Sequence, residues 1–144
     1  MSTDPRDIVV GTEAPVLERT IELPDMVAYA GSTWDWHKLH YDHDYLAAKQ
    51  VPAPVVDGQM FGALLAEQVL DWLGPDAVLR SLHFRFKALV FAGETVRCVA
   101  TVTAIDPDED GDGDLMTIES RVEVVGENAR VVVAPAGARV VVRR

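Results

Sequence analysis

The sequence holds a single cysteine, Cys98, and its basic residues are few: 13 Lys and Arg stand against 23 Asp and Glu, a formal net charge of -10. One cysteine excludes an intrachain disulfide and gives no sign of an oxidising compartment. The acidic balance argues against nucleic acid and anionic membranes as partners, because both attract a net basic face. Cys98 falls in an alternating apolar pattern, so we expect a small buried hydrophobe.

Long apolar runs are also lacking. None approaches the roughly 20 residues that cross a bilayer, and the polar start of the chain lacks the basic-then-apolar pattern of a signal peptide. We therefore expect a soluble, cytoplasmic protein with no membrane partner. The 144 residues predict one domain, residues 1–144, with residues 1–12 loosely held.

A phosphate-bearing ligand remains compatible with the acidic balance. At physiological salt, charges are screened over about 8 Å, so a local basic cluster can act independently of the total. The candidates for such a cluster are Arg80, Arg85, Lys87 and Arg97.

Apolar periodicity predicts one dominant helix, at residues 58–73, which is apolar around most of its circumference and therefore belongs inside the domain. A shorter helix is predicted from Asp25 through Tyr29, stopped by Gly31. Alternating patterns predict strands at residues 14–23, 81–90, 95–102, 116–124 and 130–142, the last with a bulge at residues 135–137. A strand, a buried helix and then an antiparallel meander predict an α+β hot dog fold, a curved sheet wrapped around a central helix.

Residues 32–56 have no clean period, and connections of that length are usually functional or disordered. The segment holds Asp35 and His40 among Trp, Tyr and His residues, which favours a functional role. A carboxylate and an imidazole can converge on one water, one orienting or deprotonating it while the other passes a proton. Spacing alone leaves open a loop-internal contact, in which Asp35 caps a turn and His40 packs beneath an aromatic ring.

Two metal-like patterns are weak. The mixed His and Asp residues at positions 35–44 lack the frame of a zinc site, so we expect no metal there. Residues 106–114 mimic half of a calcium-binding EF-hand loop, but Thr117 stands where the bidentate Glu is needed and strands flank the loop. A solvated hairpin tip is the expected structure.

The stretch from Tyr29 to Asp42 resembles the hydratase motif of the MaoC-like, (R)-specific enoyl-CoA hydratases, a hot dog family. The family pattern runs from an aromatic residue through small residues to Asp-x-Asn-Pro-x-His, and Asp35 and His40 match its Asp and His. The family's helix opening, His-Gly followed by Met or a similar residue, aligns with residues 57–60. The sequence departs from the pattern at His37 and Lys38 (usually Asn and Pro), at Asp57 (usually His) and at Gly62 (often Ser).

The resemblance implies reversible syn hydration of a trans-2-enoyl thioester, carried by CoA or acyl carrier protein, to the (R)-3-hydroxyacyl product, with no cofactor. Asp35 and His40 would activate the water. The backbone N–H of Gly58, at a helix N-terminus, could stabilise negative charge on the thioester oxygen; alternatively, Gly58 only permits close packing. The expected substrate-binding residues are Trp34, Trp36, Tyr41, Asp57, Met60, Phe61 and Gly62.

Relatives in this family pair their sheets edge to edge, so we expect a dimer. A homodimer is favoured, and a mixed dimer with a paralogue stays open. Two other functions also stay open: an acyl-CoA thioesterase in which Asp57 activates water, and a subunit of a heteromeric hydratase.

Overall fold

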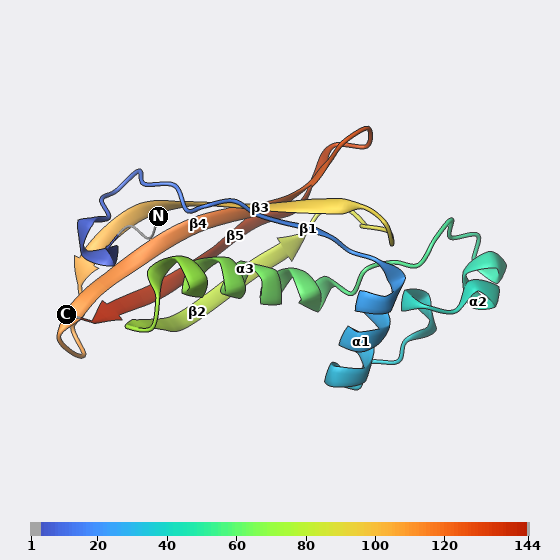
Figure 1. Ribbon diagram of the computed structural model, residues 1–144, viewed down its shortest axis with the longest axis horizontal. Coiled ribbons are helices and arrows are strands. Elements are labelled where there is room, and N and C mark those ends of the chain that lie inside the picture. Colours follow the sequence, from blue (N-terminus) through green and yellow to red (C-terminus); the bar gives the residue numbers. More distant parts are fainter. Residues whose placement is uncertain (1–3, 144) are drawn as a thin grey trace.

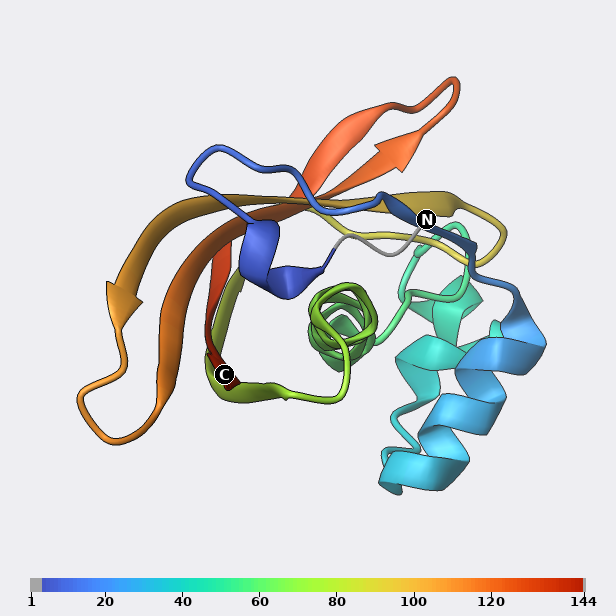
Figure 2. The ribbon, with the colours of Figure 1, turned by 60° about the vertical axis from the view of Figure 1, so that its left-hand side comes forward.

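A computed structural model describes residues 4–143, in which five antiparallel strands curve around one long helix, α3. Figure 1 shows the order of the elements, and Figure 2 views α3 end-on inside the curve of the sheet. The strand order is β1-β3-β4-β5-β2, which confirms the predicted hot dog fold. The elements are η1 (Pro5–Asp7), β1 (Leu17–Thr20), α1 (Leu23–Thr33), η2 (Lys38–His40), α2 (His43–Ala48), α3 (Gly58–Leu73), β2 (Ala77–Phe86), β3 (Thr95–Pro107), β4 (Gly113–Val125) and β5 (Arg130–Arg143).

Helix α3 spans the predicted residues and is buried along most of its length. Asp57 caps its N-terminus, where the side chain accepts a hydrogen bond from the Gln59 N–H, and Gly74 closes the C-terminus at a φ of 80°. Leu65 is fully buried between the helix and the sheet. Because the apolar positions run around the helix, only a sheet that curves around it can cover them.

The inner face of the sheet follows the predicted alternation. Val96, Cys98, Ala100 and Val102 of β3 are all buried, as are the alternate residues of β4 from Met116 to Val124. The strands β3, β4 and β5 extend beyond their predicted ranges. Strand β2 is instead shifted: it begins at Ala77, directly after the turn at the end of α3, and ends at Phe86 rather than at residue 90. Cross-strand pairing continues into the polar ends of β3 and β4, where apolar and polar residues no longer alternate in the sequence.

The bulge in β5 lies slightly earlier than predicted. Ala136 pairs with Ser120 but Val133 pairs with Val122, so three steps along β5 match two along β4. The extra residue therefore falls at residues 134–135, overlapping the predicted range at Pro135.

Three differences from the expectations concern the first fifty residues. Strand β1 ends at Thr20 because Leu23 already belongs to α1, whose start is closed by reciprocal hydrogen bonds between Glu22 and Asp25. Helix α1 does not stop at Gly31 but runs on to Thr33. The short helix α2, capped by Asp42, lies in the region predicted to be irregular.

Residues 4–12 are held more firmly than expected. Ile8 is buried in the core, and Gly11 donates its backbone N–H to the Val102 carbonyl at 2.8 Å. Residues 1–3 lie outside the described residues. Within residues 4–143, no helix combines the length and apolar character needed to span a membrane.

We predict opposite effects from Ala at two helical glycines. A Cβ at Gly62 would lie 2.6 Å from two ring atoms of Phe84, whereas one at Gly31 would meet Trp36 at an ordinary 3.6 Å. Ala favours helix by about 1 kcal/mol over Gly, but overpacking costs about 1–3 kcal/mol. In urea unfolding we expect Gly31→Ala to be stabilised and Gly62→Ala destabilised by about 1 kcal/mol; equal gains in both would contradict the packing at Gly62.

Cys98 is predicted to resist thiol reagents in the folded chain. It is 1% exposed, and burial raises the pKa of its thiol to about 12. Because the thiolate is the reactive form, burial and pKa together suppress alkylation. We expect iodoacetamide at about pH 8 to label the urea-unfolded chain but not the native one. Equal labelling rates in the two states would show that Cys98 is accessible.

Candidate functional site

The site begins where α1 ends. Trp34 adopts a left-handed conformation, with a φ of 60°, and both its N–H and that of Asp35 donate to the Ala30 carbonyl. This closure turns the chain sharply, so Asp35 leaves the helix end at a fixed position. One oxygen of the Asp35 side chain then accepts the His37 N–H at 3.2 Å.

His40 is oriented by the backbone of the segment that precedes α3. Its Nδ1 lies 2.6 Å from the Val55 carbonyl oxygen, and the Val55 N–H donates to the Leu39 carbonyl at 3.1 Å. A carbonyl can only accept, so Nδ1 carries the proton of the neutral ring and Nε2 presents a lone pair. The Val56 N–H donates to the Val90 carbonyl, which ties this segment to the strand region of the fold.

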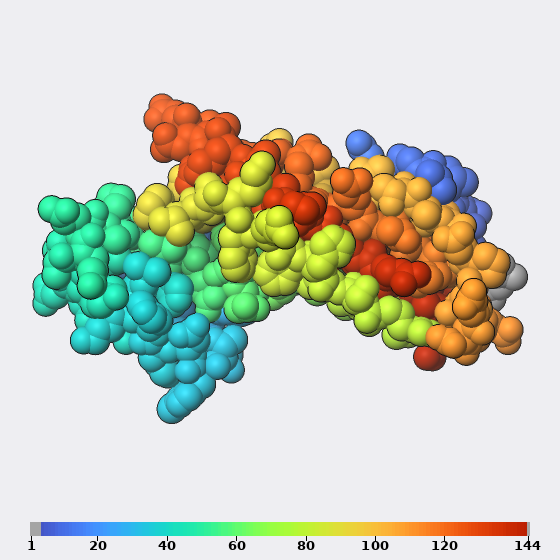
Figure 3. Space-filling view, turned by 180° about the vertical axis from the view of Figure 1, so that it is seen from behind, coloured from blue at the N-terminus to red at the C-terminus, as the bar shows by residue number. Residues whose placement is uncertain are grey.

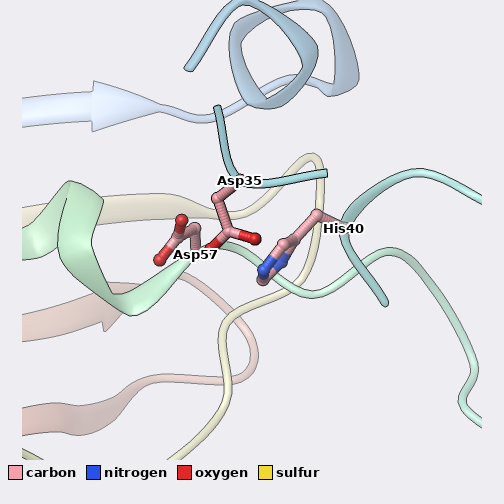
Figure 4. A group of neighbouring side chains, drawn as sticks. All are labelled: Asp35, His40 and Asp57. Carbon is pink, nitrogen blue, oxygen red and sulfur yellow. The ribbon is translucent and has the colours of Figure 1, made fainter. Parts of the chain in front are cut away.

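Asp57 is the third member of the site. One of its oxygens accepts the Gln59 N–H at 2.9 Å as the N-cap of α3. Ligand-type atoms of Asp35, His40 and Asp57 all lie within 4.8 Å of one another, and Figure 4 shows the three side chains pointing toward a common space. Asp35 is exposed, while the other two are half-buried. Two carboxylates and an imidazole can therefore share one small ligand, such as a water.

The other His and Asp residues of this region do not join the group. The His37 ring accepts the Leu39 N–H and caps η2, and Asp42 accepts the Tyr45 N–H and caps α2. These hydrogen bonds cap short local helices, although the His37 ring also lies edge-on to the His40 ring, at a centroid distance of 6.0 Å. The group of three is chemically able to hold a cation, so the expected absence of a metal stays a prediction.

Tyr29 was not among the expected site residues. Burial raises the pKa of its phenol, and the nearby negative charge of Asp57 raises it further. The hydroxyl thus stays a neutral donor close to the N-terminus of α3. Its place at the start of the motif was the available indication, since the family pattern opens on an aromatic residue.

Gly58 and Gly62 form the face of α3 against which two rings of β2 lie. A Cβ at Gly58 would clash with the Phe86 ring, as one at Gly62 would with the Phe84 ring. The close-packing explanation for Gly58 is therefore supported. A role for its backbone N–H is compatible with this packing, because the N–H lies at the helix N-terminus beside Asp57.

The expected substrate-binding aromatics divide into a surface cluster and one buried ring. Trp36 makes edge-on contacts with Trp34 and Tyr41, at centroid distances of 6.1 and 6.0 Å, and Trp34 is 80% exposed. Phe61 is 2% exposed and belongs to the main core, whereas Met60 is half-buried. The aromatic cluster thus lies at the surface beside the site, and Phe61 is enclosed by core residues.

The predicted basic cluster is not assembled. Arg80 pairs with Asp108 and Asp110 at the β3–β4 turn, and Arg97 of β3 pairs with acidic residues of β1 and β4. Arg80 and Arg97 are thus held in separate ion pairs, whereas Arg85, near the end of β2, and Lys87, just after it, form no ion pair within residues 4–143. The turn between Pro107 and Gly113 is a hairpin tip, as expected from the sequence.

Comparisons with known proteins agree on one family. The model of the MaoC like domain matches residues 9–128. The chain is 32% identical over 120 residues to the 3-oxo-4,17-pregnadiene-20-carboxyl-CoA hydratase beta subunit of Mycobacterium tuberculosis, covering 83% of this chain and 85% of that protein. It is 29% identical over 104 residues to the (R)-specific enoyl-CoA hydratase of Rhodospirillum rubrum, covering 72% of each.

The fold is also shared with a solved complex. The ChsH1-ChsH2 complex of Mycobacterium tuberculosis contains a chain with a TM-score of 0.80 and 26% identity, covering 94% of this chain and 98% of that one. A curved sheet around a central helix defines a hot dog protein, and an Asp and His group lies at the N-terminus of that helix. The chain belongs to the MaoC-like family. This is a family of hydratases and dehydratases, which supports an enzyme of this kind.

We predict that the capping role of Asp57 can be separated from its charge. Asp57→Ala removes the side-chain acceptor for the Gln59 N–H and should lower the free energy of unfolding by about 1 kcal/mol. Asp57→Ser keeps an N-cap acceptor without the charge and should recover most of that loss. Urea unfolding at neutral pH measures both variants, and equal losses for Ala and Ser would disprove the capping contribution.

Proposed function

We propose that this chain catalyses the reversible hydration of trans-2-enoyl thioesters to (R)-3-hydroxyacyl thioesters. The observation that carries the proposal is the convergence of Asp35 and His40 at the N-terminus of α3, in a chain of the MaoC-like family. The similarity to an (R)-specific enoyl-CoA hydratase supports the same reaction class. The substrate would be an acyl-CoA or an acyl carrier protein thioester.

In this mechanism one water lies between the Asp35 carboxylate and Nε2 of His40. The Val55 carbonyl holds the proton of His40 on Nδ1, which leaves Nε2 able to accept a hydrogen bond or a proton from water. The water oxygen bonds to C3 of the enoyl group while C2 gains a proton on the same face. Asp35 and His40 act between them as base and acid, a contribution on the order of 100- to 10,000-fold in rate.

The Gly58 N–H would stabilise the transition state by donating to the thioester carbonyl oxygen. Negative charge develops on the carbonyl oxygen as water adds, and an N–H at the start of a 16-residue helix is favourably placed for it. The exposed or half-buried side chains beside this helix end would contact the substrate: Trp34, Trp36, Tyr41, Asp57 and Met60. Phe61 and Gly62, also expected there from the sequence, are buried and would line the site only from behind this layer.

A second candidate function is a subunit role in a heteromeric hydratase. Two observations favour it: one relative is named as a beta subunit, and a structural neighbour belongs to a complex of two different chains. The catalytic group would act in the same way, but full activity would require a partner chain.

The hydration proposal is tested by loss of the enoyl thioester absorbance with crotonyl-CoA and with a bulkier enoyl-CoA. We expect Asp35→Asn and His40→Ala each to lower kcat/KM by at least about a hundredfold. His43→Ala is the matched control, since His43 starts α2 outside the group of three. It should stay within about threefold of the wild type, because an imidazole outside the site makes no differential contact in the transition state.

The same reactions should be followed with a thiol reagent. Release of free CoA without hydration would replace the proposal with a thioesterase, in which Asp57 activates the water. A folded wild-type chain that hydrates neither substrate would overturn its action as a lone hydratase. Restoration of hydration by a paralogous chain would then establish the subunit role.

A further inference from the structure

The segment that precedes α3 is held by the loop between β2 and β3, residues 87–94. Val55 of this segment and Phe91 of the loop form an isolated antiparallel bridge. Two backbone hydrogen bonds flank the bridge: the Val56 N–H donates to the Val90 carbonyl at 2.8 Å, and the Ala92 N–H donates to the Pro54 carbonyl at 2.9 Å. In Figure 3 the yellow loop lies between the teal residues of the α2 region and the orange-red start of β5.

This bridge decides where the Val55 carbonyl points. In an antiparallel pair, the N–H and C=O of one residue point to the same side, and those of its neighbours point to the opposite side. Residues 54 and 56 face the loop, so Val55 faces away from it. Its carbonyl oxygen lies 2.6 Å from Nδ1 of His40, and its N–H donates to the Leu39 carbonyl at 3.1 Å. The loop thus fixes the acceptor that keeps the His40 proton on Nδ1.

One arginine holds the loop on both sides of the bridge. Arg130, the first residue of β5, donates to the two side-chain oxygens of Glu94 at 2.8 and 2.7 Å and to the Leu89 carbonyl at 2.7 Å. Glu94 also accepts the Phe91 N–H at 2.9 Å. The residues that contact the α3 segment, 90–92, therefore lie between two points at which the loop is bound to the ion pair.

The geometry of the ion pair suits it to fix an orientation. Two parallel hydrogen bonds between a guanidinium and a carboxylate restrict the relative rotation of the two groups. The side chains of Arg130 and Glu94 are 27% and 18% exposed, so water screens them less than the surface pairs of the chain. The hydrogen bonds from Arg130 hold the pKa of the Glu94 carboxyl below its usual range, so Glu94 stays ionised at neutral pH.

We propose that Glu94 and Arg130 form a positioning pair for His40, acting through the β2–β3 loop and the Val55 carbonyl. The pair keeps the ring proton on Nδ1 and the lone pair of Nε2 directed toward the water. This inference rests on the proposed function, because that function assigns Nε2 to the water. Both residues lie outside the segment that resembles the family motif, so the motif did not indicate them.

The test replaces the arginine and observes the His40 ring directly. Arg130→Met removes the guanidinium and keeps an unbranched side chain. Arg80→Met is the matched control, because Arg80 pairs with Asp108 and Asp110 at the β3–β4 turn. Long-range NMR correlations between ring protons and ring nitrogens identify the tautomer at about pH 8, where an ordinary histidine is neutral. The His40 signals are assigned by their absence in His40→Ala, and circular dichroism confirms folding.

We expect the wild type and Arg80→Met to carry the His40 proton on Nδ1, and Arg130→Met to show a mixture of the two tautomers. The kcat of Arg130→Met for an enoyl thioester should fall by at least about tenfold while KM stays within about threefold. A misplaced acid–base group costs rate without removing the contacts that bind the substrate. A folded Arg130→Met chain that keeps either the wild-type tautomer or the wild-type kcat would overturn the proposal.

The tautomer is measured without substrate, which separates this inference from the proposed function. A wild-type chain that hydrates nothing would overturn the function, and the tautomer would still decide whether the pair orients His40. If Arg130→Met does not fold, Glu94→Gln takes its place, because it removes the charge and keeps an acceptor for the Phe91 N–H. Its matched control is Glu18→Gln, which breaks the exposed ion pair with Arg97. The same tautomer mixture and loss of kcat are expected, and their absence would overturn the proposal.

Discussion

Burial of α3 is the constraint on which the rest of the structure depends. The helix is apolar around most of its circumference, so it needs a curved sheet on one side and the chain's N-terminal segments on another. Its C-terminal half is enclosed, with Leu73 only 1% exposed. Its N-terminus is the end at which polar groups gather, because the unpaired N–H groups of the first turn require acceptors. Asp57 meets this requirement as the N-cap of the helix.

Backbone hydrogen bonds bring Asp35 and His40 to the same place. The Val55 carbonyl orients the His40 ring, and the Val55 N–H binds Leu39, so one residue holds both the side chain and its loop. The end of α1 fixes Asp35 independently, through the Ala30 carbonyl. Because these contacts involve the backbone, they form with His37 and Lys38 in the turn between Asp35 and His40. The departure from the family motif changes side chains without removing the contacts that position the pair.

Periodicity predicted α3 and the inner faces of β3 and β4 because their burial repeats regularly along the sequence. It could not predict that α1 continues through Gly31, since the end is set by the left-handed Trp34, or that α2 forms, since six residues carry too little pattern. Asp35 and His40 were found through their spacing and a family motif. Asp57 lies beside them because of the path that the chain takes between α2 and α3. No local sequence pattern predicts that path.

Phe86 connects the site to the open edge of the sheet. Its ring lies on Gly58, the residue whose N–H would face the thioester, and half of its surface is exposed beside the unpaired side of β2. The polarity around the Gly58 N–H therefore depends in part on how this half-exposed ring is covered, because excluding water strengthens electrostatic interactions.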